Sequence, residues 1–179
     1  MIPAERQISR SHNLLAYLTL TLIAGAVILL DQLTQDWVRG NLAFGESLVP
    51  WPDLLPFVRI LNWRNTGAAF GMFQEGGLVF AILAIVVVIM IIYYFPRIQR
   101  GDWALRLAMG LQLGGAVGNL IDRLQHGYVT DFIAVGAFPV FNVADASITM
   151  GVVVLLLSIW LGGDPEAGPE PVKDQVAND

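Results

Sequence analysis

The chain has 179 residues, of which 55% are hydrophobic and only 14% are charged, whereas a soluble domain has about 25% charged residues. The formal net charge is −5, and most of it belongs to the C-terminal segment 164–179, so nothing suggests a nucleic-acid partner. The absence of cysteine excludes disulfides, thiolate nucleophiles and cysteine-ligated metals. We therefore predict one compact membrane domain, residues 1–163, followed by a disordered acidic tail, residues 164–179.

Four apolar stretches approach the roughly 20 residues that a helix needs to cross a bilayer. They are residues 13–30, 77–95, 103–121 and 146–163. Each is expected to be helical, because lipid offers no hydrogen-bond partner to backbone groups. The small residues 24–26 would also fit a cleavage site in a signal peptide, but the apolar run continues to Leu30. The predicted fold is an all-α, four-transmembrane-helix bundle.

The connections between the spans carry two strand-like segments. Residues 57–65 partly alternate apolar and polar, and residues 129–142 are rich in β-branched and aromatic side chains, with Gly136 and Pro139 as turn signals. We expect a small antiparallel β element lying against the outer membrane face. Lysine and arginine are denser at the termini and in the connection between spans two and three. This distribution predicts that both termini are cytoplasmic and that segments 31–76 and 122–145 face outward.

Polar residues gather at the outward ends of the spans, where composition alone does not explain them. Three of them, Asn119, Asp122 and Arg123, share one helix face because of their spacing. The full set is Asp31, Asn65, Asn119, Asp122, Arg123, Asp131, Asn142 and Asp145. Acids at such positions are costly and by default indicate function.

Each of these residues also has a purely structural interpretation. Asn142 can cap the fourth helix, and Asp145 can favour the dipole of its first turn. Asp122 and Arg123 can form a structural ion pair, and Asp31 can simply mark where the first span leaves the lipid. The glycines at positions 110, 114 and 118 recur every four residues, which is typical of close helix packing.

Carboxylate chemistry is what remains for catalysis on this face. The two histidines, His12 and His126, are predicted to fall on opposite sides of the membrane, so neither a metal site nor a Ser/His/Asp triad is expected, and we predict no cofactor. Two carboxyl groups held close together cannot both ionise cheaply, so one keeps a proton. Such a pair can activate water and protonate a departing nitrogen. Asp131 and Asp145 need only the turn at Gly136 and Pro139 to meet.

Five motifs in this order resemble the lipoprotein signal peptidase, or signal peptidase II, family of the bacterial inner membrane. They are DQLT at 31–34, NTGAAFG at 65–71, GGAVGNLIDR at 114–123, VTDFI at 129–133 and FNVADASI at 141–148. The resemblance implies an intramembrane aspartic endopeptidase that cleaves prolipoproteins before a diacylglyceryl-modified cysteine. It also implies a four-helix bundle with an outward β-cradle and a site near the periplasmic face.

The resemblance implies roles for particular residues. Asp131 and Asp145 match the family's catalytic pair. The positions that match the polar surroundings of that pair are Asp31, Asn65, Gly67, Asn119, Arg123 and Asn142. The chain departs from the family pattern at Gln35, where lysine is common, and at Thr130, where an apolar residue is more usual. The expected partners are prolipoproteins and membrane lipids, and we expect a monomer.

Two other functions and one other catalytic pair remain as alternatives. A small proton-coupled transporter subunit would use Asp131 and Asp145 as a relay, but would spread its acids through the bilayer depth. A non-catalytic assembly factor that binds lipidated proteins would not need converging carboxylates. Within the protease interpretation, Asp122 could replace Asp131, although Arg123 beside it would keep it charged. We predict that the Asp131 and Asp145 carboxylates lie within about 6 Å of each other, with Asp122 turned away.

Overall fold

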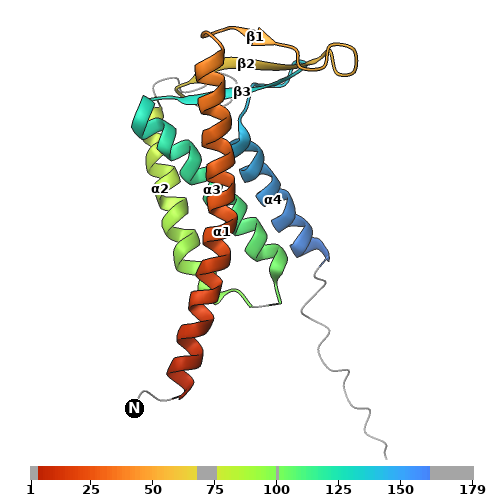
Figure 1. Ribbon diagram of the computed structural model, residues 1–179. Coiled ribbons are helices and arrows are strands. Elements are labelled where there is room, and N and C mark those ends of the chain that lie inside the picture. The colour runs from red at the N-terminus through yellow and green to blue at the C-terminus, as the bar shows by residue number, and fades with distance from the viewer. Residues whose placement is uncertain (1–3, 68–75, 100, 162–179) are drawn as a thin grey trace, which may run out of the picture.

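The computed structural model describes residues 4–67, 76–99 and 101–161. Four helices, each long and apolar enough to cross a membrane, run side by side (Figure 1). They are α1 (Ala4–Asn41), α2 (Gly77–Tyr94), α3 (Trp103–His126) and α4 (Val143–Leu161). A short 3-10 turn, η2 (Phe95–Arg97), follows α2. The four-helix bundle predicted from hydropathy is confirmed, while the predicted acidic tail, 164–179, lies outside the described residues.

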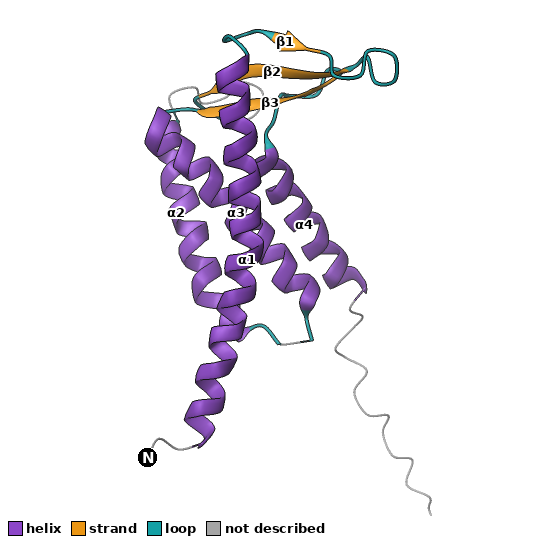
Figure 2. Ribbon diagram, in the orientation of Figure 1, coloured by secondary structure: helices purple, strands orange, loops and turns teal. Residues whose placement is uncertain are grey.

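A small antiparallel sheet lies across one end of the bundle (Figure 2). Its strands are β1 (Ser47–Leu48), β2 (Val58–Asn65) and β3 (Val129–Val135), in the order β1-β2-β3. Both predicted strand segments are confirmed, whereas the two-residue β1 was not anticipated. Gly136 ends β3 at φ +54°, a conformation that suits glycine, and so supplies the predicted turn. The register places Trp63 opposite Asp131, which fixes where the Asp131 side chain leaves the sheet.

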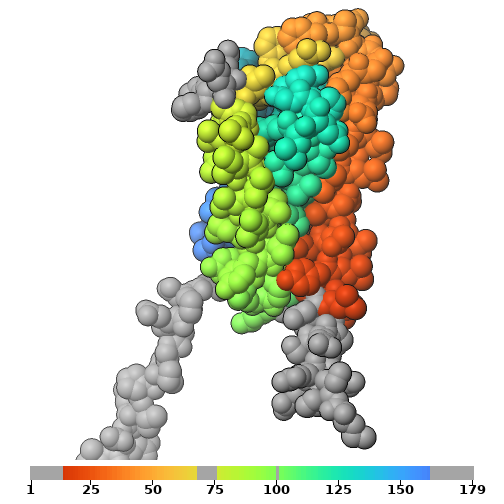
Figure 3. Space-filling view, turned by 90° about the vertical axis from the view of Figure 1, so that its left-hand side faces the viewer, coloured from red at the N-terminus to blue at the C-terminus, as the bar shows by residue number. Residues whose placement is uncertain are grey.

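Helix α3 packs against the three other helices, and its glycines permit the close approach. A Cβ atom at Gly110 would lie 2.6 Å from Cγ2 of Ile23, and one at Gly114 would lie 2.6 Å from Cβ of Val27. The predicted glycine packing face is therefore confirmed, and its partner is α1. In the space-filling view the upper end of α3 lies beside α1, below the sheet (Figure 3). This packing holds the polar ends of α1 and α3 together.

Helix α1 does not end at Leu30, where its apolar run ends. The helix continues to Asn41, about 15 Å farther at 1.5 Å per residue. Beyond Asp31 its inner face is still buried: Val38 is 1% exposed and packs with Leu42, the residue after the helix, and with Phe132 of β3. Hydropathy reports contact with lipid, whereas this part of α1 is stabilised by contact with the sheet. The same reason explains why α3 continues to His126 and why α4 already begins at Val143.

Candidate active site

Asp131 is held at the junction of sheet and bundle by two amides. It lies in β3 and is 2% exposed. Asn65, at the end of the paired strand β2, donates to its Oδ2 at 2.8 Å, and Asn142, just before α4, donates to its Oδ1 at 3.2 Å. Both oxygens therefore accept hydrogen bonds from amides that come from separate segments, and this arrangement fixes the plane of the carboxyl group.

Asp145 is connected to Asp131 through two asparagine side chains. Asn119 of α3 donates to Asp145 Oδ1 at 2.8 Å and accepts from Asn142 Nδ2 at 3.1 Å. The amide of Asn142 thus contacts Asp131 on one side and Asn119 on the other. We name this Asp131–Asn142–Asn119–Asp145 chain the amide bridge. Within the described residues no donor reaches Asp145 Oδ2, so that oxygen keeps its lone pairs for another partner.

Asn142 also begins α4, as predicted. Its Oδ1 accepts from the backbone N–H of Asp145 at 2.8 Å, which is the geometry of a helix N-cap. The cap and the amide bridge use different atoms of one buried side chain, so Asn142 makes both sets of contacts at once. Asp145 lies in the first turn of α4, where the helix dipole favours a negative charge.

The environment of Asp131 favours its neutral form. Burial raises the pKa of Asp131 to about 7, and the charge of Asp145 adds to the increase, while the hydrogen bond from Asn65 and the charge of Arg123 oppose it. Asp131 therefore keeps a proton at pH values where an exposed aspartate has lost it. A mutual effect of this kind is expected of two carboxyl groups that titrate as a coupled pair.

Asp31 lies behind α4, on the buried face of α1. Its Oδ1 accepts from the backbone N–H of Ala144 at 3.0 Å, and its Oδ2 accepts from Gln35 at 3.0 Å. A Cβ atom at Gly118 would lie 2.7 Å from Asp31 Oδ2, so any larger residue there would displace the Asp31 carboxyl group. Asp31 thus contacts the backbone next to Asp145, not the two candidate catalytic carboxyl groups themselves.

Asp122, the rival for the catalytic pair, belongs to a different set of contacts. It is fully buried, and its Oδ2 accepts from the backbone N–H of Thr130 at 3.0 Å. Its ion pair is with Arg39 of α1 at 3.5 Å. The ion pair suggested by sequence, with Arg123, is not among the ion pairs of the described residues. These two contacts tie Asp122 to β3 and α1.

Arg123 and Gly67 complete the predicted set. Arg123 donates to the backbone oxygen of Asn119 at 3.2 Å, and its guanidinium lies 5.6 Å from the ring centroid of Phe80. Its Nε is buried and has no partner in the part of the chain that the structure describes. The backbone N–H of Gly67 donates to Asn65 Oδ1 at 3.0 Å, which orients that amide toward Asp131.

Sequence reasoning missed Gln35, Arg39 and Thr130 as members of a buried network. Gln35 and Thr130 are fully buried, and Arg39 Nη1 lies 3.1 Å from Gln35 Oε1 and 2.8 Å from Thr130 Oγ1. The usable signal was the spacing of Asp31, Gln35 and Arg39, which places all three on one face of a continuing helix.

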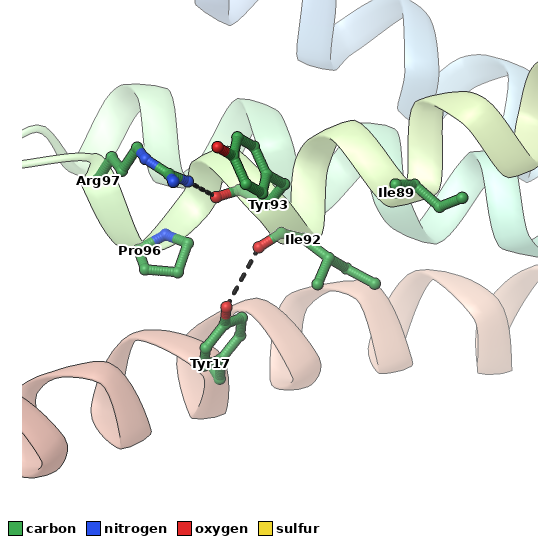
Figure 4. A pocket seen from close by; sticks show the side chains of 6 residues that line it. All are labelled: Tyr17, Ile89, Ile92, Tyr93, Pro96 and Arg97. Carbon is green, nitrogen blue, oxygen red and sulfur yellow. Dashed lines mark hydrogen bonds between the residues drawn. The ribbon is translucent and has the colours of Figure 1, made fainter.

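A groove of about 700 Å³ lies between α1 and the end of α2, at the opposite end of the bundle from the candidate site. Figure 4 shows the side chains that line it. Tyr17 of α1 reaches across it to the backbone oxygen of Ile92 in α2 at 3.2 Å. The remaining lining residues are Ile89, Tyr93, Pro96 and Arg97. The groove contains no carboxyl group and so offers nothing to the chemistry of the aspartates.

The comparisons with known proteins agree with this geometry. The sequence model of a family described as signal peptidase (SPase) II matches residues 23–161. The lipoprotein signal peptidase of Shouchella clausii is 40% identical over 146 residues, covering 81% of this chain and 95% of that protein. The enzyme of the same name from Moorella thermoacetica is 39% identical over 150 residues, covering 84% and 97%.

Two solved structures, both described as bacterial membrane enzymes, have the same fold. One has a TM-score of 0.74 at 33% identity and covers 87% of this chain and 94% of its own. The other has a TM-score of 0.69 at 34% identity, covering 79% and 92%.

Four apolar helices and these matches define a multi-pass membrane protein that is an aspartic peptidase, and therefore a hydrolase. The family model extends over most of the chain, from within α1 to the end of α4. The chain belongs to the signal peptidase II family. The transporter alternative finds no support in these matches.

Proposed function

We propose that this enzyme removes the signal peptide from prolipoproteins, cleaving before a diacylglyceryl-modified cysteine, and that Asp131 and Asp145 are its catalytic pair. The observation that carries the proposal is the amide bridge. It ties two carboxyl groups from β3 and α4 into one hydrogen-bonded unit at the end of a membrane bundle. Asp122 does not take part in that unit.

The chemistry needs one ionised and one protonated carboxyl group. The ionised group takes a proton from water while the water oxygen bonds to the scissile carbonyl carbon. The protonated group then gives its proton to the amide nitrogen, the C–N bond breaks, and a carboxylic acid and the amine of the cysteine result. The pair ends with one proton, as it began. The raised pKa of Asp131, about 7, supports a proton on the pair at neutral pH and below.

The supporting residues have distinct proposed roles. Asn65, Asn119 and Asn142 orient the carboxyl groups, and the N–H of Gly67 orients Asn65. Asp31 holds the backbone at the start of α4. Arg123 supplies a positive charge near both acids, and its buried Nε is available to a substrate carbonyl.

Large apolar side chains on the sheet and its loops support contact with lipid. They are Phe44, Val49, Trp51, Leu54, Phe57, Trp63 and Phe138, and all are exposed. We propose that this surface rests on the periplasmic leaflet, where a lipidated cysteine is held. Trp160, near the C-terminal end of α4, and Trp103, the first residue of α3, are exposed at the other end of the bundle, as expected of a second interface. Both termini would then be cytoplasmic, and one site per chain is consistent with a monomer.

The test is cleavage of a purified diacylglyceryl-modified prolipoprotein by purified enzyme in detergent. Mass spectrometry should find a product that begins at the lipidated cysteine, and the same precursor without the lipid should remain uncut. Asp131→Asn and Asp145→Asn should each abolish cleavage, whereas Asp102→Asn, at the N-cap of α3 and at the opposite end of the bundle, should leave it unchanged because asparagine caps a helix as well as aspartate does. Cleavage of both precursors at equal rates would contradict the proposed substrate, and an active Asp131→Asn enzyme would contradict the proposed pair.

A further inference from the structure

One face of α1 carries three polar residues that approach the backbone beside both proposed catalytic aspartates. Asp31, Gln35 and Arg39 are spaced by four residues and therefore lie in line along the helix. Asp31 and Gln35 are fully buried, and the Arg39 side chain is only 16% exposed. Polar groups buried so deeply are costly unless they are hydrogen-bonded, so their partners show what they hold in place.

The lower end of this line holds the start of α4. Asp31 Oδ1 accepts from the N–H of Ala144, the residue immediately before Asp145. The second carboxylate oxygen accepts from Gln35 Nε2 at 3.0 Å and from Gln32 Nε2 at 3.2 Å. The position of the Asp145 backbone along its helix axis therefore depends on α1.

The upper end of the line holds β3. Arg39 Nη1 donates to Thr130 Oγ1 at 2.8 Å, and Thr130 immediately precedes Asp131. Because neighbouring residues of a strand point to opposite faces, Thr130 faces α1 while Asp131 faces Asn65 and Asn142. The contact between Arg39 and Thr130 therefore holds the strand from behind the reacting carboxyl group.

Gln35 joins the two ends into one network. Its Nε2 donates to Asp31, and its Oε1 accepts from Arg39 Nη1 at 3.1 Å. Gln35 and Thr130 are also the two positions at which the chain departs from the family pattern, and a single guanidinium nitrogen contacts both. A cation from one helical turn beyond position 35 thus reaches the network.

We propose that Gln35, Arg39 and Thr130 are positioning residues that fix the separation of the Asp131 and Asp145 carboxyl groups through the backbone of the residues preceding them. This inference rests on the proposed function. It follows that loosening the network should slow the chemical step and leave substrate binding intact, because none of the three side chains contacts the two carboxyl groups. A displacement of about 1 Å at reacting groups costs as much as 100-fold in rate.

The test compares Thr130→Val, Thr130→Ser and Gln35→Leu with wild type on the lipidated precursor, measuring kcat and KM per folded, monodisperse enzyme. Thr130→Val removes the hydroxyl with little change of shape, and Thr130→Ser keeps it. The matched control is Thr34→Val, because the Thr34 hydroxyl bonds only to backbone oxygens of its own helix. The double variant Gln35→Leu/Thr130→Val asks whether the two residues act through one network.

We expect Thr130→Val and Gln35→Leu each to lower kcat about 10-fold to 100-fold with KM unchanged. Thr130→Ser should restore most of the rate, Thr34→Val should match wild type, and the double variant should be little worse than the poorer single one. Thr130→Val with wild-type kcat, or a loss seen only in KM or in the folded fraction, would overturn the inference. Failure of wild type to cleave would instead refute the proposed function.

Discussion

Substitutions at Asn142 can separate its capping of α4 from its contact with the proposed catalytic acids, because different atoms of its side chain make the two interactions. Its Oδ1 caps the helix through the Asp145 N–H, while its Nδ2 donates to Asp131 and to Asn119. Asn142→Ser keeps a good capping oxygen but is too short to bridge the acids, and Asn142→Ala loses both functions.

The magnitudes follow from those contacts. Losing an N-cap costs about 1 kcal/mol of stability, so Asn142→Ala should unfold at lower temperature than Asn142→Ser. A hydrogen bond to a charged group contributes about 1.5–3 kcal/mol, and each 1.36 kcal/mol corresponds to a tenfold change in rate. Asp131 gains negative charge as it gives up its proton, so the bond from Asn142 strengthens in the transition state, and both variants should lose about 10-fold to 100-fold in kcat.

The assay measures cleavage of the lipidated precursor and thermal unfolding of the same detergent-solubilised preparations. The expected pattern is equal loss of kcat in the two variants with unequal melting temperatures. If Asn142→Ser retains the wild-type kcat, the amide does not orient Asp131, and the amide bridge has no part in catalysis. If the rates instead follow the melting temperatures, Asn142 acts only as a cap.

Two further predictions concern pH and packing. Activity should fall as the pH rises through about 7, because the proton on Asp131 is present below its raised pKa and lost above it. Arg123→Gln should move this decline to higher pH, since the Arg123 charge lowers the pKa of Asp131. The same pH–rate profile for Arg123→Gln and wild type would contradict the assignment. Gly118→Ala should lower the melting temperature and the activity, because its Cβ would lie 2.7 Å from Asp31 Oδ2. The control Gly25→Ala, whose Cβ would have nothing within 4 Å, should be neutral or slightly stabilising. Equal effects of the two substitutions would refute the close-packing argument.

The parts of the fold that are readable from sequence are those set by local pattern. Apolar runs give the four helices, because a span must be both apolar and helical. The alternation of apolar and polar residues predicts β2, and β-branched residues predict β3. Asn142, three residues before Asp145, predicts the N-cap of α4. The end of α1 is not readable in this way, because the segment after Asp31 is stabilised by contacts with residues more than ninety positions away.

The candidate site shows the same division. Chemistry and motif order predict which residue types matter, and the structure brings Asn65, Asn119 and Asn142 onto the two acids. The predicted ion pair between Asp122 and its sequence neighbour Arg123 is wrong, because Asp122 pairs instead with Arg39 of α1. Side-chain pairing across a bundle depends on helix rotation and on where each helix ends, neither of which hydropathy determines.

The most direct test of the central claim is to compare single and double replacements of the two aspartates on a lipidated precursor under single-turnover conditions. If Asp131 and Asp145 act as one unit, Asp131→Asn, Asp145→Asn and the double variant should all lose nearly the same large factor, because removing either carboxyl group already disables the pair. Losses that multiply in the double variant, or an Asp131→Asn enzyme that cleaves at the wild-type rate while Asp122→Asn does not, would contradict it.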